Sequence, residues 1–170
     1  YPVYSGFNVA DGKIYITNDE HSPDSIPWRG GKLWVYDAFT GEALWNISGK
    51  LRNGAISSGY FTTLNSLDGQ IYTFGKGPSK TTVTAPQSAV TSGSPIMITG
   101  TVTDQSPGAP DSPAISDLSM SAWMEYLYEQ KQMPTNAIGV PVKLTAVGPN
   151  GETTNIGTAV SNIAGTYGLA

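Results

Sequence analysis

The sequence predicts a mainly β chain in two parts, and three observations lead to this expectation. Charged residues make up only 13% of the 170 residues, whereas 20 glycines and 12 prolines supply many turn formers. A hairpin pattern recurs along the first 77 residues. Beyond them, the chain changes to short segments in which apolar and polar residues alternate, as they do in half-buried strands.

The recurring pattern consists of a turn glycine, a long polar residue, a branched aliphatic residue and an aromatic residue. It occurs at residues 11–16, 30–35 and 68–73. Glycine allows the positive φ that a tight turn needs, and the side chains that follow alternate between the two faces of a strand. Each copy is therefore expected to be the second arm of a hairpin.

The spacing of these copies defines a repeat of about forty residues. Gly31 and Gly69 lie 38 residues apart, and Gly59 takes the place of Gly12 in the next unit, 47 residues further on. A unit of this length with four short strands has the size of a β-propeller blade. Residues 1–77 are therefore predicted to hold about the last two blades of a propeller that they do not complete.

A polar turn that leads to a tryptophan follows the second copy of the pattern. Asp37 and Thr40 are expected to hold this turn by hydrogen bonds to backbone amides, and Gly41 is expected to adopt the left-handed conformation. Together with Trp45, these residues resemble the blade signature of pyrroloquinoline-quinone-like (PQQ-like) propeller repeats. The resemblance implies that Trp45 packs between neighbouring blades and that the motif is structural.

Residues 78–170 are predicted to form an immunoglobulin-like sandwich that is incomplete at its C-terminal end. About five strands are expected where about seven complete such a sandwich. The alternating segments are residues 81–86, 95–103, 140–147, 154–160 and 164–168.

Residues 104–137 form a predicted insertion in this sandwich, with a short helix at its centre. Ser116 or Asp117 can cap the start of the helix, and Pro134 is expected to end it. Four apolar residues at helical spacing form a stripe that is expected to pack in a core rather than to hold a cofactor. This stripe consists of Met120, Trp123, Met124 and Leu127.

The insertion and its neighbours are similar to the segment that follows the propeller in large archaeal cell-surface proteins with PQQ-like repeats. The similarity lies in residues 100–108, 113–117 and 120–128. In such proteins, further surface domains and a C-terminal membrane anchor commonly follow. The resemblance implies an extracellular location at the cell surface and a place within a larger chain or assembly. The expected partners are the rest of the same polypeptide or other protein subunits.

The composition excludes several classes of function. A net charge of −4 leaves no basic stripe that could bind nucleic acid. The chain has no run of eighteen apolar residues, so we expect no membrane contact within this segment. The resemblance to quinone-dependent dehydrogenases would imply a disulfide between adjacent cysteines against the cofactor, but the chain has no cysteine. We therefore expect no cofactor and no enzymatic activity.

The loop insertion at about residues 19–29 carries the remaining candidate site residues. Its carboxylates, Asp19, Glu20 and Asp24, are candidate calcium ligands, although their spacing does not match an EF-hand loop. The sole histidine, His21, lacks a second histidine for a zinc site. Propeller loops commonly present binding surfaces, so the candidate partner contacts are His21, Trp28 and Arg29.

Asn46 begins an Asn-Ile-Ser sequence, which is an acceptor for N-linked glycosylation and fits an extracellular setting. With this setting, the leading hypothesis is a non-enzymatic structural or interaction module of a cell-surface protein. The second hypothesis is a propeller that binds a polymer or a partner protein. A quinoprotein-like enzyme is the third.

Overall fold

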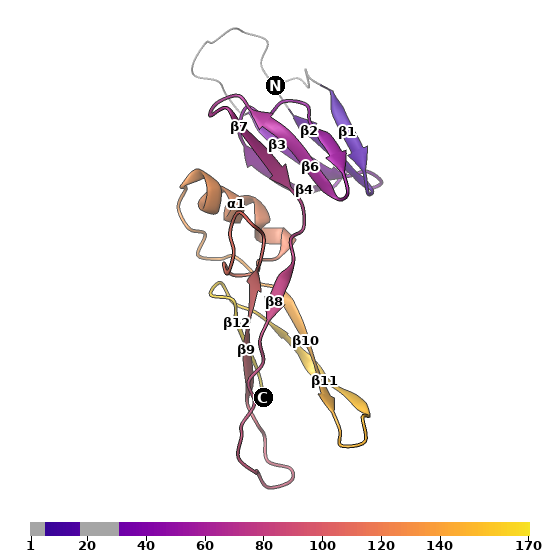
Figure 1. Cartoon of the computed structure of the whole chain (residues 1–170), viewed down its shortest axis with the longest axis vertical. Helices are drawn as coiled ribbons and strands as arrows, with labels where there is room; N and C mark the ends of the chain where they lie inside the picture. The colour runs from indigo at the N-terminus through magenta and orange to yellow at the C-terminus, as the bar shows by residue number, and fades with distance from the viewer. Residues whose placement is uncertain (1–5, 18–30) are drawn as a thin grey trace. The chain divides into compact units, whose positions relative to one another are not determined.

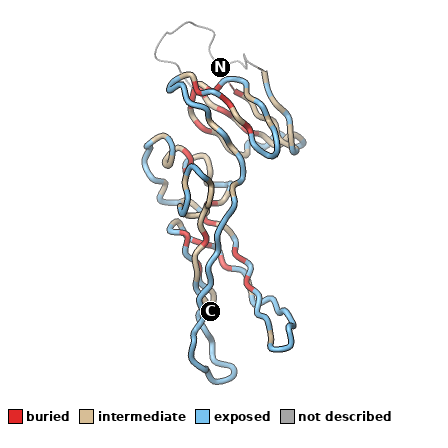
Figure 2. The backbone as a smooth tube through the Cα atoms, in the orientation of Figure 1, coloured by how far each residue is buried: buried red, intermediate tan, exposed pale blue. Residues whose placement is uncertain are grey.

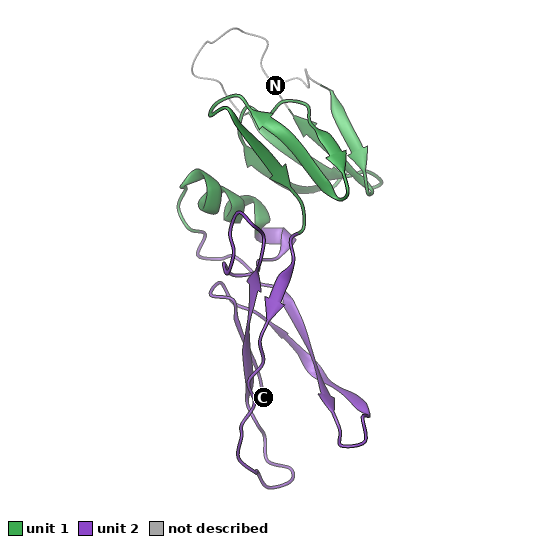
Figure 3. Ribbon diagram, in the orientation of Figure 1, with its two compact units in different colours: residues 1–76, 120–133 green, residues 77–119, 134–170 purple. Residues whose placement is uncertain are grey.

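The computed structural model describes residues 6–17 and 31–170, and these residues form a mainly β structure. The chain divides into two compact units (Figure 3). Residues 1–76 and 120–133 make the first unit, and residues 77–119 and 134–170 make the second.

A four-stranded antiparallel sheet opens the first unit, with its strands adjacent in chain order (Figure 1). The turn between the first two strands has positive φ angles at Asp11 and Gly12, as in the primed turns that suit the twist of a hairpin. The pattern at residues 11–16 therefore forms the second arm of a hairpin. The strands are β1 (Phe7–Ala10), β2 (Lys13–Thr17), β3 (Lys32–Asp37) and β4 (Ala43–Ser48).

A second antiparallel sheet of three strands follows in the same unit. Its first turn repeats the chemistry of the earlier one, because Ser58 and Gly59 also have positive φ angles. The pattern at residues 68–73 forms the second arm of the next hairpin, as predicted. The strands are β5 (Ala55–Ser57), β6 (Tyr60–Asn65) and β7 (Gln70–Phe74).

The two sheets of the first unit pack against each other through one core (Figure 2). The side chains of Leu33, Val35 and Ile47 are buried on one sheet, and Phe61 is buried on the other. Rings complete the contact, since Tyr15 stacks on Phe61 with 5.1 Å between centroids. Burial of these apolar side chains is the main stabilising contribution to this unit.

Helix α1 (Met120–Glu129) packs with the first unit, although the sequence places it within the predicted sandwich. Met124 is buried in the first unit's core and Met120 packs against it, which agrees with the predicted apolar stripe. A 3-10 turn, η1 (Asp117–Ser119), precedes the helix, and Ser116 Oγ accepts a hydrogen bond from the amide of Leu118.

The predicted end of the helix at Pro134 is wrong, because α1 already ends at Glu129. Gln130 has a φ of 56°, in the left-handed region, and the amide of Lys131 donates to the carbonyl of Glu125. This hydrogen bond joins residues six positions apart, and together with the left-handed residue it closes the helix without proline.

Five strands form the second unit, and four of them agree closely with predicted segments. The first strand ends at Thr81, where the predicted segment 81–86 begins, and beyond it only Thr84 forms an isolated bridge, to Thr99. Three of them make an antiparallel sheet in the order β12-β9-β8, and the other two make an antiparallel pair. Val102, Val142, Leu144, Ala159 and Tyr167 form the core between these sheets. The strands are β8 (Ser79–Thr81), β9 (Ile98–Asp104), β10 (Pro141–Val147), β11 (Thr153–Val160) and β12 (Thr166–Leu169).

Candidate functional site

The polar turn between β3 and β4 has the geometry that the sequence predicts. Asp37 Oδ1 accepts hydrogen bonds from the amides of Phe39 and Thr40, at 2.9 and 2.8 Å. Because these amides stabilise the carboxylate, they hold the pKa of Asp37 below its ordinary value. Thr40 Oγ1 accepts from the amide of Glu42, and Gly41 has a φ of 75°. These hydrogen bonds account for Asp37, Thr40 and Gly41 by local structure.

Trp45 lies on β4 and packs between the two sheets of the first unit. Its ring lies 5.5 Å from that of Phe74 on β7 and 6.4 Å from that of Tyr15 on β2. The tryptophan of the motif therefore contacts a neighbouring sheet.

The candidate residues of the loop insertion lie outside the described residues. They are Asp19, Glu20, His21, Asp24, Trp28 and Arg29. Among the residues that the structure describes, no group of three or more histidine, aspartate or glutamate side chains is arranged to hold a metal ion.

The glycosylation sequence lies on β4, and two of its side chains take part in hydrogen bonds. Asn46 Oδ1 accepts from the Lys32 ammonium at 2.6 Å, and Ser48 Oγ donates to Glu125 Oε1 at 2.7 Å. Asn46 is half-buried. Glycosylation at this asparagine remains a prediction.

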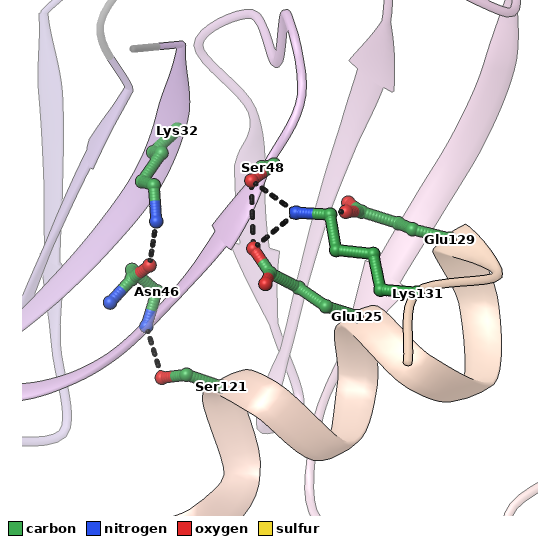
Figure 4. A network of polar contacts seen from close by, with 7 residues as sticks. All are labelled: Lys32, Asn46, Ser48, Ser121, Glu125, Glu129 and Lys131. Atoms are coloured by element: carbon green, nitrogen blue, oxygen red, sulfur yellow. Dashed lines mark hydrogen bonds and ion pairs between the residues drawn. The ribbon is translucent and has the colours of Figure 1, made fainter. Parts of the chain in front are cut away.

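Helix α1 covers the outer edge of β4 with a polar network (Figure 4). β4 is the last strand of its sheet, so its outer backbone groups have no partner strand. The backbone amide of Asn46 donates instead to Ser121 Oγ at 3.0 Å. One turn further along the helix, Glu125 accepts from Ser48. The helix thus replaces a neighbouring strand at this edge.

Lys131 closes the network beyond the end of the helix. Its ammonium lies 3.1 Å from a Glu125 oxygen and 3.3 Å from a Glu129 oxygen, and it donates to Ser48 Oγ at 3.1 Å. The two carboxylates are only 18% and 16% exposed. One lysine therefore neutralises two largely buried acids beside the strand edge.

The pKa values of this network differ in direction. Burial alone would raise the pKa of Glu125, but the hydrogen bonds from Ser48 and Lys131 outweigh burial and lower it. At Glu129, burial prevails over Lys131 and the pKa is raised. Burial alone would lower the pKa of Lys131, but hydrogen bonding to Glu125 and the carboxylate charges raise it. Of the two carboxylates in the network, Glu129 therefore protonates more readily.

A shallow hollow of about 330 Å³ adjoins this network. Asp68 and Tyr72 line it from the β6–β7 hairpin, and Tyr128 and Glu129 line it from the helix. The Tyr72 hydroxyl donates to Asp68 Oδ2 at 2.7 Å, and burial together with this carboxylate raises the pKa of Tyr72. The hollow presents two phenol rings and two carboxylates, which are groups able to bind hydroxyl-rich ligands.

An apolar surface covers the side of the β1–β4 sheet that faces away from the β5–β7 sheet. We term it the outer face. Residues directly opposite each other in neighbouring strands share a face, and the strand register places six apolar or aromatic side chains together here. None of them is buried, and Phe7 and Val9 are 62% and 59% exposed. The six residues are Phe7, Val9, Ile14, Ile16, Trp34 and Tyr36.

The second unit contains an open hollow of about 570 Å³ between its two sheets. Val102, Ala114, Val140 and Val142 line it, together with residues of β8 and with Lys143. β8 is an edge strand of its sheet, and β10 pairs with a strand on one side only. The hollow is therefore flanked by two strands that each have an edge without a partner strand.

Sequence reasoning missed the contacts that α1 makes with β4. Ser121, Glu125 and Lys131 carry these contacts, and none of them was singled out from the sequence. A partial signal exists, since Ser121 and Glu125 are four residues apart and so lie on one helix face beside the apolar stripe. That spacing indicates a second contact face without identifying the strand that it meets.

Comparison of the chain with protein-family models, with curated proteins and with solved structures found no match. Within the described residues, no helix combines the length and apolar character needed to span a membrane.

Proposed function

We propose that the chain is a non-enzymatic structural or interaction module of an extracellular, cell-surface protein. The finer form of this proposal is that PQQ-like propeller sheets precede an immunoglobulin-like sandwich. The observation that carries the proposal is that the first unit leaves an apolar sheet surface exposed and that the second contains an open hollow beside two strand edges without partner strands. Exposed apolar surfaces of this kind mark sites of contact with other proteins.

In the first unit, the support comes from the outer face of the β1–β4 sheet. This sheet is a four-stranded antiparallel meander whose other face packs on a second sheet of the same sequence repeat. That arrangement favours blades stacked in an array. Within such an array, the uncovered face is an interface with the rest of the polypeptide or with another subunit.

In the second unit, the support comes from the hollow beside β8 and β10. An extended segment that enters the hollow would bury side chains against Val102 and Val142. Its backbone would meet the open edges of the two strands, as in strand addition. The unit therefore has the properties of a sandwich that another segment or subunit completes.

A second candidate function is a binding module for a polymer or a partner protein. The hollow that includes Tyr72, Tyr128, Asp68 and Glu129 favours this alternative. Tyr128 is 44% exposed, so part of its side chain is accessible to a ligand. Most polar atoms of Asp68 are already used within the chain, which makes this candidate the weaker one.

Sedimentation velocity of the full chain over a wide range of concentration tests the leading proposal. We expect self-association and enhanced fluorescence of an apolar dye. Thr81→Glu adds a charge to the exposed β8 edge beside the hollow and should weaken the association. Asn150→Glu adds the same charge to an exposed hairpin turn outside the hollow and should not. A monomer that binds no dye at any concentration would refute the proposal.

A further inference from the structure

We propose that the outer face docks a four-stranded antiparallel sheet of the same repeat, one that presents an aliphatic face like that of Leu33, Val35 and Ile47. The inference rests on the proposed function, because it identifies the partner that covers one of the two open surfaces. It extends an interface that the chain already contains, between its own two sheets.

The repeat allows the two sheets to be compared residue by residue. When Gly12 is matched with Gly59 and Gly31 with Gly69, the outer-face positions of β2 and β3 correspond to positions in β6 and β7, and Val9 of β1 corresponds to Ile56 of β5. Four of the six corresponding residues of the second sheet pack in the core that it shares with the first sheet, and the other two are Gly54 and Thr63. The matched pairs are Ile14 with Phe61, Trp34 with Tyr72 and Tyr36 with Phe74.

The opposite faces correspond in the same way. Leu33 on the covered face of the first sheet is matched with Ile71 of the second. Leu33 is 0% exposed, because the β5–β7 sheet covers it, whereas Ile71 is 72% exposed. The second sheet therefore turns towards the first the face that corresponds to the outer face of the first sheet. If another repeat sheet packs on the first sheet in the same way, it places an aliphatic face like that of Leu33 against the outer face.

A second copy of the chain presents a poorer surface for this purpose. Its exposed sheet face is that of β5–β7, which has three strands and lacks a counterpart of β4. Thr62 and Thr73 occupy the positions of Tyr15 and Val35, and their hydroxyls lie 3.2 Å apart in a hydrogen bond. This polar pair fits an aromatic and aliphatic face badly. The four-stranded repeat sheet is the better partner.

A tandem chain tests the inference with the protein's own first sheet as the probe. In the tandem chain, residues 1–52 form an added first copy that is joined directly to Gly6, and residues 6–170 follow as the original copy. The turn glycines of the two copies are then 47 residues apart, as Gly12 and Gly59 are. Because the chain has no cysteine, Ile16→Cys in the original copy supplies a single thiol on the outer face. We expect its alkylation rate to fall by about tenfold or more relative to the single chain.

Two controls separate docking from misfolding and from mere proximity. Val35→Cys in the original copy should be protected in both chains, which verifies that the sheet is folded. Leu33→Asp with Val35→Asp in the added copy alone should restore fast alkylation at Ile16→Cys, since the docking face is then charged.

Fast alkylation of Ile16→Cys in the folded tandem chain would overturn the inference. Protection in the single chain that rises with concentration would also overturn it, because a second copy would then be the partner. Either result leaves the proposed function intact if Thr81→Glu still weakens association, so the two failures are distinguishable.

Discussion

Removing the ring of Phe61 tests whether the two sheets of the first unit share one core. The side chain is 2% exposed and its ring lies 5.1 Å from that of Tyr15 and 6.4 Å from that of Phe74. Phe61→Ala loses the transfer free energy of the ring and leaves a cavity, which together cost about 3 to 5 kcal/mol. Stacking with two rings places the expected loss at about 4 kcal/mol.

Urea unfolding followed by tryptophan fluorescence measures this loss. The tryptophans that the structure describes, Trp34, Trp45 and Trp123, all belong to the first unit, so the signal reports that unit. Phe39→Ala is the matched control, because Phe39 is 89% exposed and its removal should change the free energy of unfolding by less than about 0.5 kcal/mol. Equal losses in the two variants would refute the shared core.

Three further predictions follow from the same unit. Gly41→Ala, at a φ of 75° with no atom near the added carbon, should cost about 1 kcal/mol through backbone strain alone, measured by urea unfolding. Ser121→Ala should speed hydrogen exchange at the amide of Asn46, whereas Ser121→Thr should not. Burial raises the pKa of Glu129, so its stabilisation is present below its ordinary value of 4.5 and is lost as pH rises through the raised pKa. Urea midpoints measured against pH should therefore fall less steeply in the Glu129→Gln variant than in the original chain. An equal slope in the two proteins would contradict the raised pKa of Glu129.

The sequence by itself determined the elements whose information is local. Turn glycines at residues 12, 59 and 69 predicted hairpins, because a tight turn requires positive φ and few residues tolerate it. Alternation predicted four of the five strands of the second unit, and the hydrogen bonds of Asp37 and Thr40 span only two or three residues. All of these features depend on neighbours in the chain.

The early end of α1 shows where local reasoning was incomplete. Pro134 is a strong helix breaker, but Gln130 ends the helix first by adopting a left-handed conformation that side chains other than glycine rarely take. That conformation turns the chain so that Lys131 reaches both Glu125 and Glu129. These ion pairs and the helix end therefore go together.

Only the tertiary structure decided which surfaces meet and which stay open. The hydrogen bonds that join β4 to α1 and to Lys131 beyond it connect residues 75 to 83 positions apart, a separation over which no periodicity in the sequence specifies a partner. The outer face is likewise defined by strand register, which places Ile16 opposite Trp34 and leaves both away from the core. Local chemistry forms hairpins and helices, whereas the free energy of burying their faces selects the partners, because burial depends on the three-dimensional proximity of distant segments.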